Sequence, residues 1–178
     1  NSGTLSSSAT SDFFLDGDGG NTNLGGFSDA DINLRKSGSS NITTTGNIDC
    51  RGFALTAAAS GTFLIDGESV TMAKYCTFQG GTLQITSGSF STTDNKDNTN
   101  LYTGFNLNGG TLDIDGGTVS FGETSDKDAT LNVNGGTVEV SGGTLNVSDA
   151  IDVVTGTVTQ TGGVINLRNY NGSGNRSQ

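Results

Sequence analysis

The sequence has no proline, no histidine and no tryptophan. The absence of histidine and of proline excludes certain kinds of site and favours certain kinds of fold. Without histidine no Ser-His-Asp triad can form, and with only two cysteines besides, a transition-metal site is not expected. Without proline, every backbone N–H can donate to a β ladder. Lys and Arg together number 8 against 18 Asp and Glu, so the net charge is −10, which disfavours nucleic acid and anionic membranes as partners. No apolar run approaches the ~18 residues of a membrane span, so membrane insertion is not expected.

A short motif, Gly-Gly-Thr-apolar-polar-apolar, returns through the second half of the chain. It reads GGTLQI at 80–85, GGTLDI at 109–114, GGTVEV at 135–140 and GGTLNV at 142–147. Each unit has the period-2 alternation of a half-buried strand followed by a glycine corner. A fixed internal period this short indicates the stacked coils of a solenoid. The sequence shows no apolar period of 3.6 residues, so no helix is expected.

The sequence therefore predicts an all-β, single-domain, three-faced parallel β-helix (β-solenoid) with about 21 residues per coil, right-handed as most parallel crossovers are. We expect residues 1–41 to form an irregular capping or strand-exchange segment, 42–167 the solenoid, and 168–178 a polar tail. The chain begins with Asn and shows no signal peptide, which indicates either a processed protein or a fragment.

The inward apolar pairs can be laid out on three faces by stepping about 21 residues at a time. The first predicted face holds Phe63/Ile65, Leu83/Ile85, Phe105/Leu107, Leu131/Val133 and Ile151/Val153. The second holds Val70/Met72, Phe90, Leu112/Ile114, Val138/Val140 and Val158. The third holds Phe53/Leu55, Cys76/Phe78, Val119/Phe121, Leu145/Val147 and Ile165/Leu167.

The GGTLxIxGGTVxF pattern over residues 80–167 resembles the parallel β-helix repeats of bacterial surface proteins, such as autotransporter passengers and haemagglutinin-like adhesins. The resemblance concerns architecture and covers about half of the chain. It implies an extracellular or cell-surface location and structural or adhesive work. It implies no catalytic residues.

Two insertions interrupt the repeat, at 91–104 and 122–129. Both are expected at the same edge of adjacent coils, where they form either a contact surface, for example for surface glycans, or a pair of solvated loops. The candidate contact residues are Asp94, Lys96, Asp97, Asp126, Lys127 and Asp128.

Three other groups of residues are candidates for specific chemistry. Asp16, Asp18, Asn21 and Asn23 have the composition of a calcium loop but lack the terminal Glu of an EF-hand, so a polar Gly-rich turn is the favoured explanation. No other cofactor is expected. Cys50 and Cys76 allow one disulfide, or two buried thiols. Asp113, Asp115 and Glu139 point outward on one face, with Asp113 and Glu139 one coil apart, as the carboxylates of a polysaccharide-acting enzyme would; solvated strand charges are the alternative, and we expect no enzyme.

The ends of the predicted solenoid favour a structural function. An open β-helix exposes unpaired strand edges, and no helix or proline is available to cover them. Phe13, Phe14 and Leu15 at one end, and Val164, Ile165 and Leu167 at the other, are the residues we expect to mediate head-to-tail self-assembly. The leading hypothesis is thus a self-assembling structural subunit of an extracellular filament or surface appendage. A glycan- or cell-binding adhesin segment and a polysaccharide-acting enzyme are the alternatives.

Overall fold

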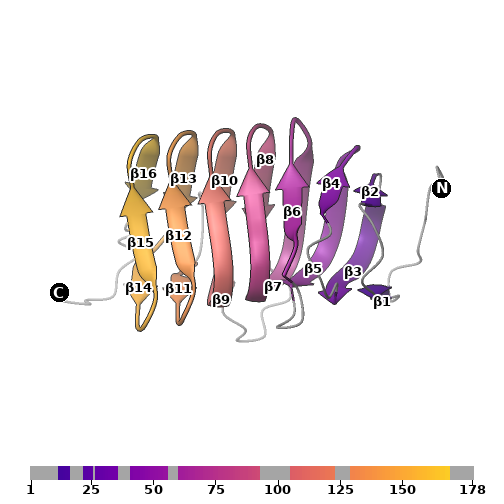
Figure 1. Cartoon of the computed structure of the whole chain (residues 1–178), viewed down its shortest axis with the longest axis horizontal. Helices are drawn as coiled ribbons and strands as arrows, with labels where there is room; N and C mark the ends of the chain where they lie inside the picture. The colour runs from indigo at the N-terminus through magenta and orange to yellow at the C-terminus, as the bar shows by residue number, and fades with distance from the viewer. Residues whose placement is uncertain are drawn as a thin grey trace, which may run out of the picture.

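The protein is described by a computed structural model, which is a parallel β-solenoid (Figure 1). The structure describes residues 12–16, 22–25, 27–35, 41–55, 60–92, 105–122 and 129–168. Within these ranges all regular structure is β-strand, and every strand pairing is parallel. Both features were predicted from the repeat.

Most strands are three to five residues long, whereas β3, β5, β7 and β9 continue round a corner of the coil into another face. They are β1 (Asp12–Asp16), β2 (Thr22–Leu24), β3 (Phe27–Arg35), β4 (Ile42–Thr44), β5 (Ile48–Leu55), β6 (Thr62–Ile65), β7 (Ser69–Ile85), β8 (Ser89–Thr92), β9 (Phe105–Ile114), β10 (Thr118–Phe121), β11 (Leu131–Val133), β12 (Thr137–Val140), β13 (Thr144–Val147), β14 (Ile151–Val153), β15 (Thr157–Gln160) and β16 (Val164–Leu167). The coils are stacked along the long axis of the molecule, from β1 near one end to β14, β15 and β16 near the other (Figure 1).

Three ladders run along the solenoid, and we name them faces A, B and C. Face A contains β1, the later part of β3, the later part of β5, residues 75–79 of β7, the start of β9, β11 and β14. Face B contains β2, β4, β6, residues 82–85 of β7, the end of β9, β12 and β15. Face C contains the starts of β3, β5 and β7, then β8, β10, β13 and β16.

The parallel ladder begins earlier than residue 42. β1 pairs with β3, and β3 with β5, so residues 12–16 and 27–35 contain strands of the same ladder rather than only an irregular segment. Residues 168–178 were expected to be a polar tail, and all but Arg168 lie outside the described residues.

The face assignment made from the sequence is wrong at one place, the coil that includes residues 93–104, which we call the joint. Phe90 pairs with Val119, whereas the sequence layout placed it with Leu112. Partners across this joint lie 29 residues apart, as Gln84 and Asp113 do, whereas Ser69 and Ser89 lie 20 apart. The extra residues belong to the coil that includes 93–104. The sequence layout groups the strands correctly within the coils before residues 93–104 and within the coils after them. It connects each face of the first group to the wrong face of the second group, one face out of step.

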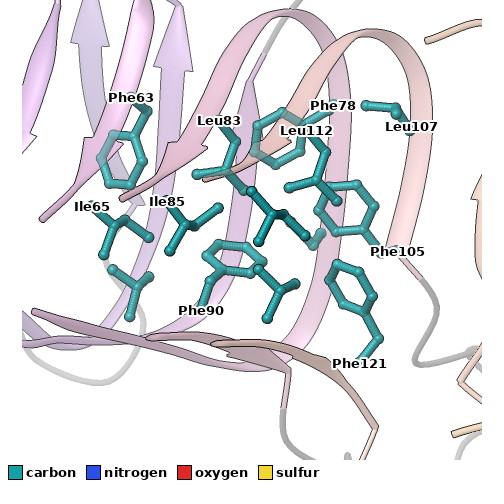
Figure 2. Close-up of a cluster of buried hydrophobic side chains, with 14 of the residues drawn as sticks. Phe63, Ile65, Phe78, Leu83, Ile85, Phe90, Phe105, Leu107, Leu112 and Phe121 are labelled. Carbon is teal, nitrogen blue, oxygen red and sulfur yellow. The ribbon is translucent and has the colours of Figure 1, made fainter. Parts of the chain in front are cut away.

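The lumen is a continuous apolar column. Apolar side chains from all three faces converge there, including Phe63, Leu83, Leu112 and Phe121 (Figure 2). The ring of Phe105 lies against those of Phe78 and Phe121, with centroids 5.0 and 4.5 Å apart. Burial of such side chains is the main source of stability, at about 25 cal/mol per Å² of apolar surface.

Candidate functional site

The carboxyl-terminal coil, formed by β14, β15 and β16, is the last coil that the structure describes. Each of its strands has a single partner among the described strands: β14 pairs with β11, β15 with β12 and β16 with β13. One backbone edge of each strand therefore has no partner among the described strands.

Exposed apolar side chains coincide with this edge. Val153 and Leu167 occupy lumen positions and are 47% and 57% exposed, whereas Val133 and Val147, their partners one coil earlier, are fully buried. Val154 and Val164 are also exposed, and these four are the only exposed large hydrophobic residues among those whose side-chain burial the structure describes. The coil thus has the surface that a further coil would cover.

The expected self-assembly residues map onto the two ends. Val164, Ile165 and Leu167 all lie in β16, with Ile165 partly buried against the core. Phe13, Phe14 and Leu15 lie in β1, whose described pairing is with β3 alone. Val153 was assigned to the lumen from the sequence but was not singled out as exposed, and Val154 was not singled out at all.

A second site is a row of acidic residues on the outside of face B. Asp113 of β9 pairs with Glu139 of β12, as the sequence predicted. Gln84 of β7, which the sequence layout placed on a different face, pairs with Asp113 from the other side. Its side-chain amide donates to Asp113 Oδ2 at 3.2 Å and to Asp115 Oδ2 at 2.8 Å.

The pKa values of the two aspartates in this row are shifted in opposite directions. Partial burial raises the pKa of Asp113, and the negative charges of Asp115 and Glu139 raise it further. The pKa of Asp115 is lowered because the Ser141 hydroxyl donates to its Oδ1 at 2.7 Å and Gln84 donates to its other oxygen. At the outward positions of the described strands of face B there is no Lys or Arg.

The two insertions start from equivalent places. Thr92, the last described residue before one insertion, pairs with Phe121 of β10, next to the other. Phe105 and Leu131, the first residues of β9 and β11 beyond the insertions, also pair. Both insertions therefore leave face C and return to face A in successive coils, so the strands that flank them share one edge. The candidate contact residues Asp94, Lys96, Asp97, Asp126, Lys127 and Asp128 lie outside the described residues.

The remaining candidates are resolved only in part. Asn23 is exposed in β2, but Asp18 and Asn21 lie outside the described residues, as does the side chain of Asp16. Where the chain is described, no three His, Cys, Asp or Glu side chains are grouped so that they could hold a metal ion. The described part also contains no helix that is long and apolar enough to cross a membrane.

Cys50 and Cys76 are both buried, and both are present as thiols rather than as a disulfide. The register pairs Cys50 with Met72 and Cys76 with Phe53, so the two cysteines are not opposite each other in the ladder. Burial raises the pKa of the Cys76 thiol, which makes its reactive thiolate scarce. A disulfide in the mature protein stays a prediction, which the mass of the unreduced chain would test.

Comparison with protein-family models, with curated proteins and with solved structures gives no match for this chain.

Proposed function

We propose that this chain is a structural subunit of an extracellular filament or surface appendage, and that its copies assemble head to tail through their open ends. The observation that supports this most strongly is the carboxyl-terminal coil, where unpaired strand edges coincide with exposed Val153 and Leu167. Adding another coil buries the apolar surface and gives the unpaired backbone groups hydrogen-bond partners. Contacts between unlike ends do not close on themselves, so they give open fibres.

Sedimentation of the full chain over a range of concentrations tests the proposal. Native chains should sediment as polymers whose size grows with concentration, and electron microscopy should show fibres. Val153→Asp and Leu167→Asp place a charge in the end surface and should give monomers with an unchanged β-type circular dichroism spectrum. Glu139→Gln on the outer wall is the control and should assemble normally.

Removing residues 1–15 tests the opposite end. The truncated chain should be monomeric because it lacks all of β1 except Asp16, and it should still be β-structured because the other strands remain. Native protein that stays monomeric at high concentration, or truncated protein that still forms fibres, would contradict head-to-tail assembly.

A glycan- or cell-binding adhesin segment is the second candidate. It is favoured by the two insertions, which leave the same edge of successive coils next to Thr92 and Phe121. Side chains gathered on one edge of a rigid scaffold are a common arrangement in binding proteins. Binding of monomers to a glycan array, lost with Asp97→Ala or Asp126→Ala, would support this candidate over the first.

The proposal assigns no catalytic role to Asp113, Asp115 and Glu139. Asp113 and Glu139 lie on neighbouring strands, about 4.8 Å apart, which is close to the carboxyl spacing of retaining glycosidases. Turnover of a neutral or acidic polysaccharide that is abolished by Asp113→Ala or Glu139→Ala would overturn the assignment.

A further inference from the structure

The ladders of the solenoid fix how two copies would meet, provided that the proposed head-to-tail assembly takes place. Along face A, one continuous row runs from Phe13 through Ile32, Phe53, Cys76, Phe105 and Leu131 to Ile151. A row on face C runs from Phe27 through Ile48, Val70, Phe90, Val119 and Leu145 to Ile165. Each row begins and ends on an apolar residue.

Both ends present the three faces in the same chain order. The first coil consists of β1 on face A, β2 on face B and the start of β3 on face C, and the last coil consists of β14, β15 and β16 in that order. Among the described strands, β1 and β2 have one partner each, and their other edges face away from the solenoid.

We infer that copies join in register, with each face of one copy continuing into the same face of the next. β14, β15 and β16 then pair in parallel with β1, β2 and the start of β3 of a second copy. Ile151 and Val153 meet Phe13 and Leu15 of that copy. A slip of one residue would turn apolar lumen positions outward, so the register is strongly specified.

The polarity of the strands separates this arrangement from a symmetric one. Two carboxyl-terminal coils facing each other across a two-fold axis would have strands running in opposite directions. That contact would be antiparallel, with a different hydrogen-bond pattern, and would stop at a dimer. Only a head-to-tail contact repeats the parallel pairing that joins every coil within the chain.

Disulfide trapping between faces tests the register. Asn23 of β2 and Thr159 of β15 both point outward on face B, and the continuous row through Asn23, Thr43, Leu64, Gln84, Asp113 and Glu139 ends at Thr159. In-register joining places Thr159 opposite Asn23 of the next copy, about 4.8 Å away, which is within the Cα range of a disulfide. Asp152 of β14 is also exposed but lies on face A.

The matched pair is Asn23→Cys with Thr159→Cys, and the mismatched control is Asn23→Cys with Asp152→Cys. Both are made in a Cys50→Ala, Cys76→Ala chain whose circular dichroism spectrum shows that it folds. Under mild oxidation the matched pair should give a ladder of covalent multimers that reduction removes, and the mismatched pair should lose that ladder. Repeating the matched pair with the native cysteines in place, and mapping the linked peptides by mass spectrometry, guards against a background that folds poorly.

The outcomes distinguish this inference from the function on which it rests. Fibres in which the mismatched pair links as well as the matched pair would overturn the register and leave filament assembly intact. Chains that remain monomeric at every concentration would overturn both. Covalent dimers from Thr159→Cys alone would show the symmetric tail-to-tail contact instead.

Discussion

Single residues decide how closely the coils can stack, and glycine at the corners is the clearest case. Gly117, between β9 and β10, has φ +64°, and a Cβ atom there would lie 2.5 Å from the carbonyl oxygen of Gly88 in the coil before. Gly67 also has a positive φ, +99°, but a Cβ there would meet nothing closer than Ser87 Oγ at 3.9 Å. The same residue type is thus required for space at one corner and only for backbone conformation at the other.

Alanine substitution should separate these two requirements. Gly67→Ala should lower the free energy of unfolding by about 1–2 kcal/mol, which is the cost of a left-handed backbone for an L-residue. Gly117→Ala should cost about 3 kcal/mol or more, because the coil below must also move. Urea denaturation measures both. Equal losses for the two variants would contradict the steric argument.

The acidic row on face B gives a residue-scale prediction about pH. The folded pKa of Asp113 is above its ordinary value, so between the ordinary and the folded pKa the folded chain binds more protons than the unfolded chain. Asp113 therefore lowers the free energy of unfolding as the pH rises through that window. Asp113→Asn should stabilise the protein at pH 7 by at most about 1 kcal/mol, since like charges opposite each other on an exposed sheet cost no more.

The gain should vanish in acid, below the ordinary pKa of aspartate, where the carboxyl is neutral in both states. Thermal unfolding at a series of pH values checks this. Asp152→Asn is the control, since it removes one charge from an exposed outward position on the same kind of strand. A stabilisation that persists or grows in acid would show that charge repulsion is not the cause.

At the scale of strands, the alternation of the sequence was sufficient to predict the architecture but not the joint between its halves. All three faces carry the same inward pattern, so rotating one half of the columns by one face still puts apolar residues on apolar residues. Only the length of the coil that includes 93–104 determines the rotation. The alternation of apolar and polar residues gives no information about that length. The motif itself held the missing signal, because Thr82, Thr111 and Thr137 of the Gly-Gly-Thr units pair in the structure.

The same error hid one partner of the acidic row. Asp113 and Glu139 both follow the joint, so their pairing was predicted correctly. Gln84 precedes it and was placed on another face, and its hydrogen bonds to Asp113 and Asp115 were therefore missed. The exposure of Val153 was not predictable from its pattern, because it depends on which strand has no neighbour.

The aromatic cluster in the lumen joins the strands on either side of this joint. Phe78 and Phe90 precede residues 93–104, and Phe105 and Phe121 follow them, with Phe105 contacting the other three rings. Phe105→Ala should lower the free energy of unfolding by about 3–5 kcal/mol. The stability of a solenoid is approximately a sum of contacts between neighbouring coils, so Phe105→Ala should also split the unfolding transition into two steps.

Calorimetry would show the split, and Phe105→Leu, which keeps most of the apolar volume, should lose less stability and keep one transition. A single sharp transition in Phe105→Ala would show that the contacts at the joint do not limit cooperativity.

At the scale of the whole molecule, charge and the open ends act against each other. The chain has a net charge of −10, so every copy that joined the proposed fibre would add ten to its net negative charge. In that fibre, apolar burial and backbone hydrogen bonds would hold the end surfaces together, and salt does not screen these contacts, whereas it does screen the repulsion between copies. Assembly should therefore strengthen with salt.

Raising NaCl from about 0.01 M to 0.15 M shortens the screening length from about 30 Å to about 8 Å. Over that range, light scattering and sedimentation should show longer fibres and a lower concentration for the onset of assembly. The Val153→Asp chain should stay monomeric throughout, because screening does not restore a buried apolar contact. Fibres that shorten as salt is added would mean that opposite charges at the two ends, rather than Val153, Leu167 and the strand edges, hold the copies together.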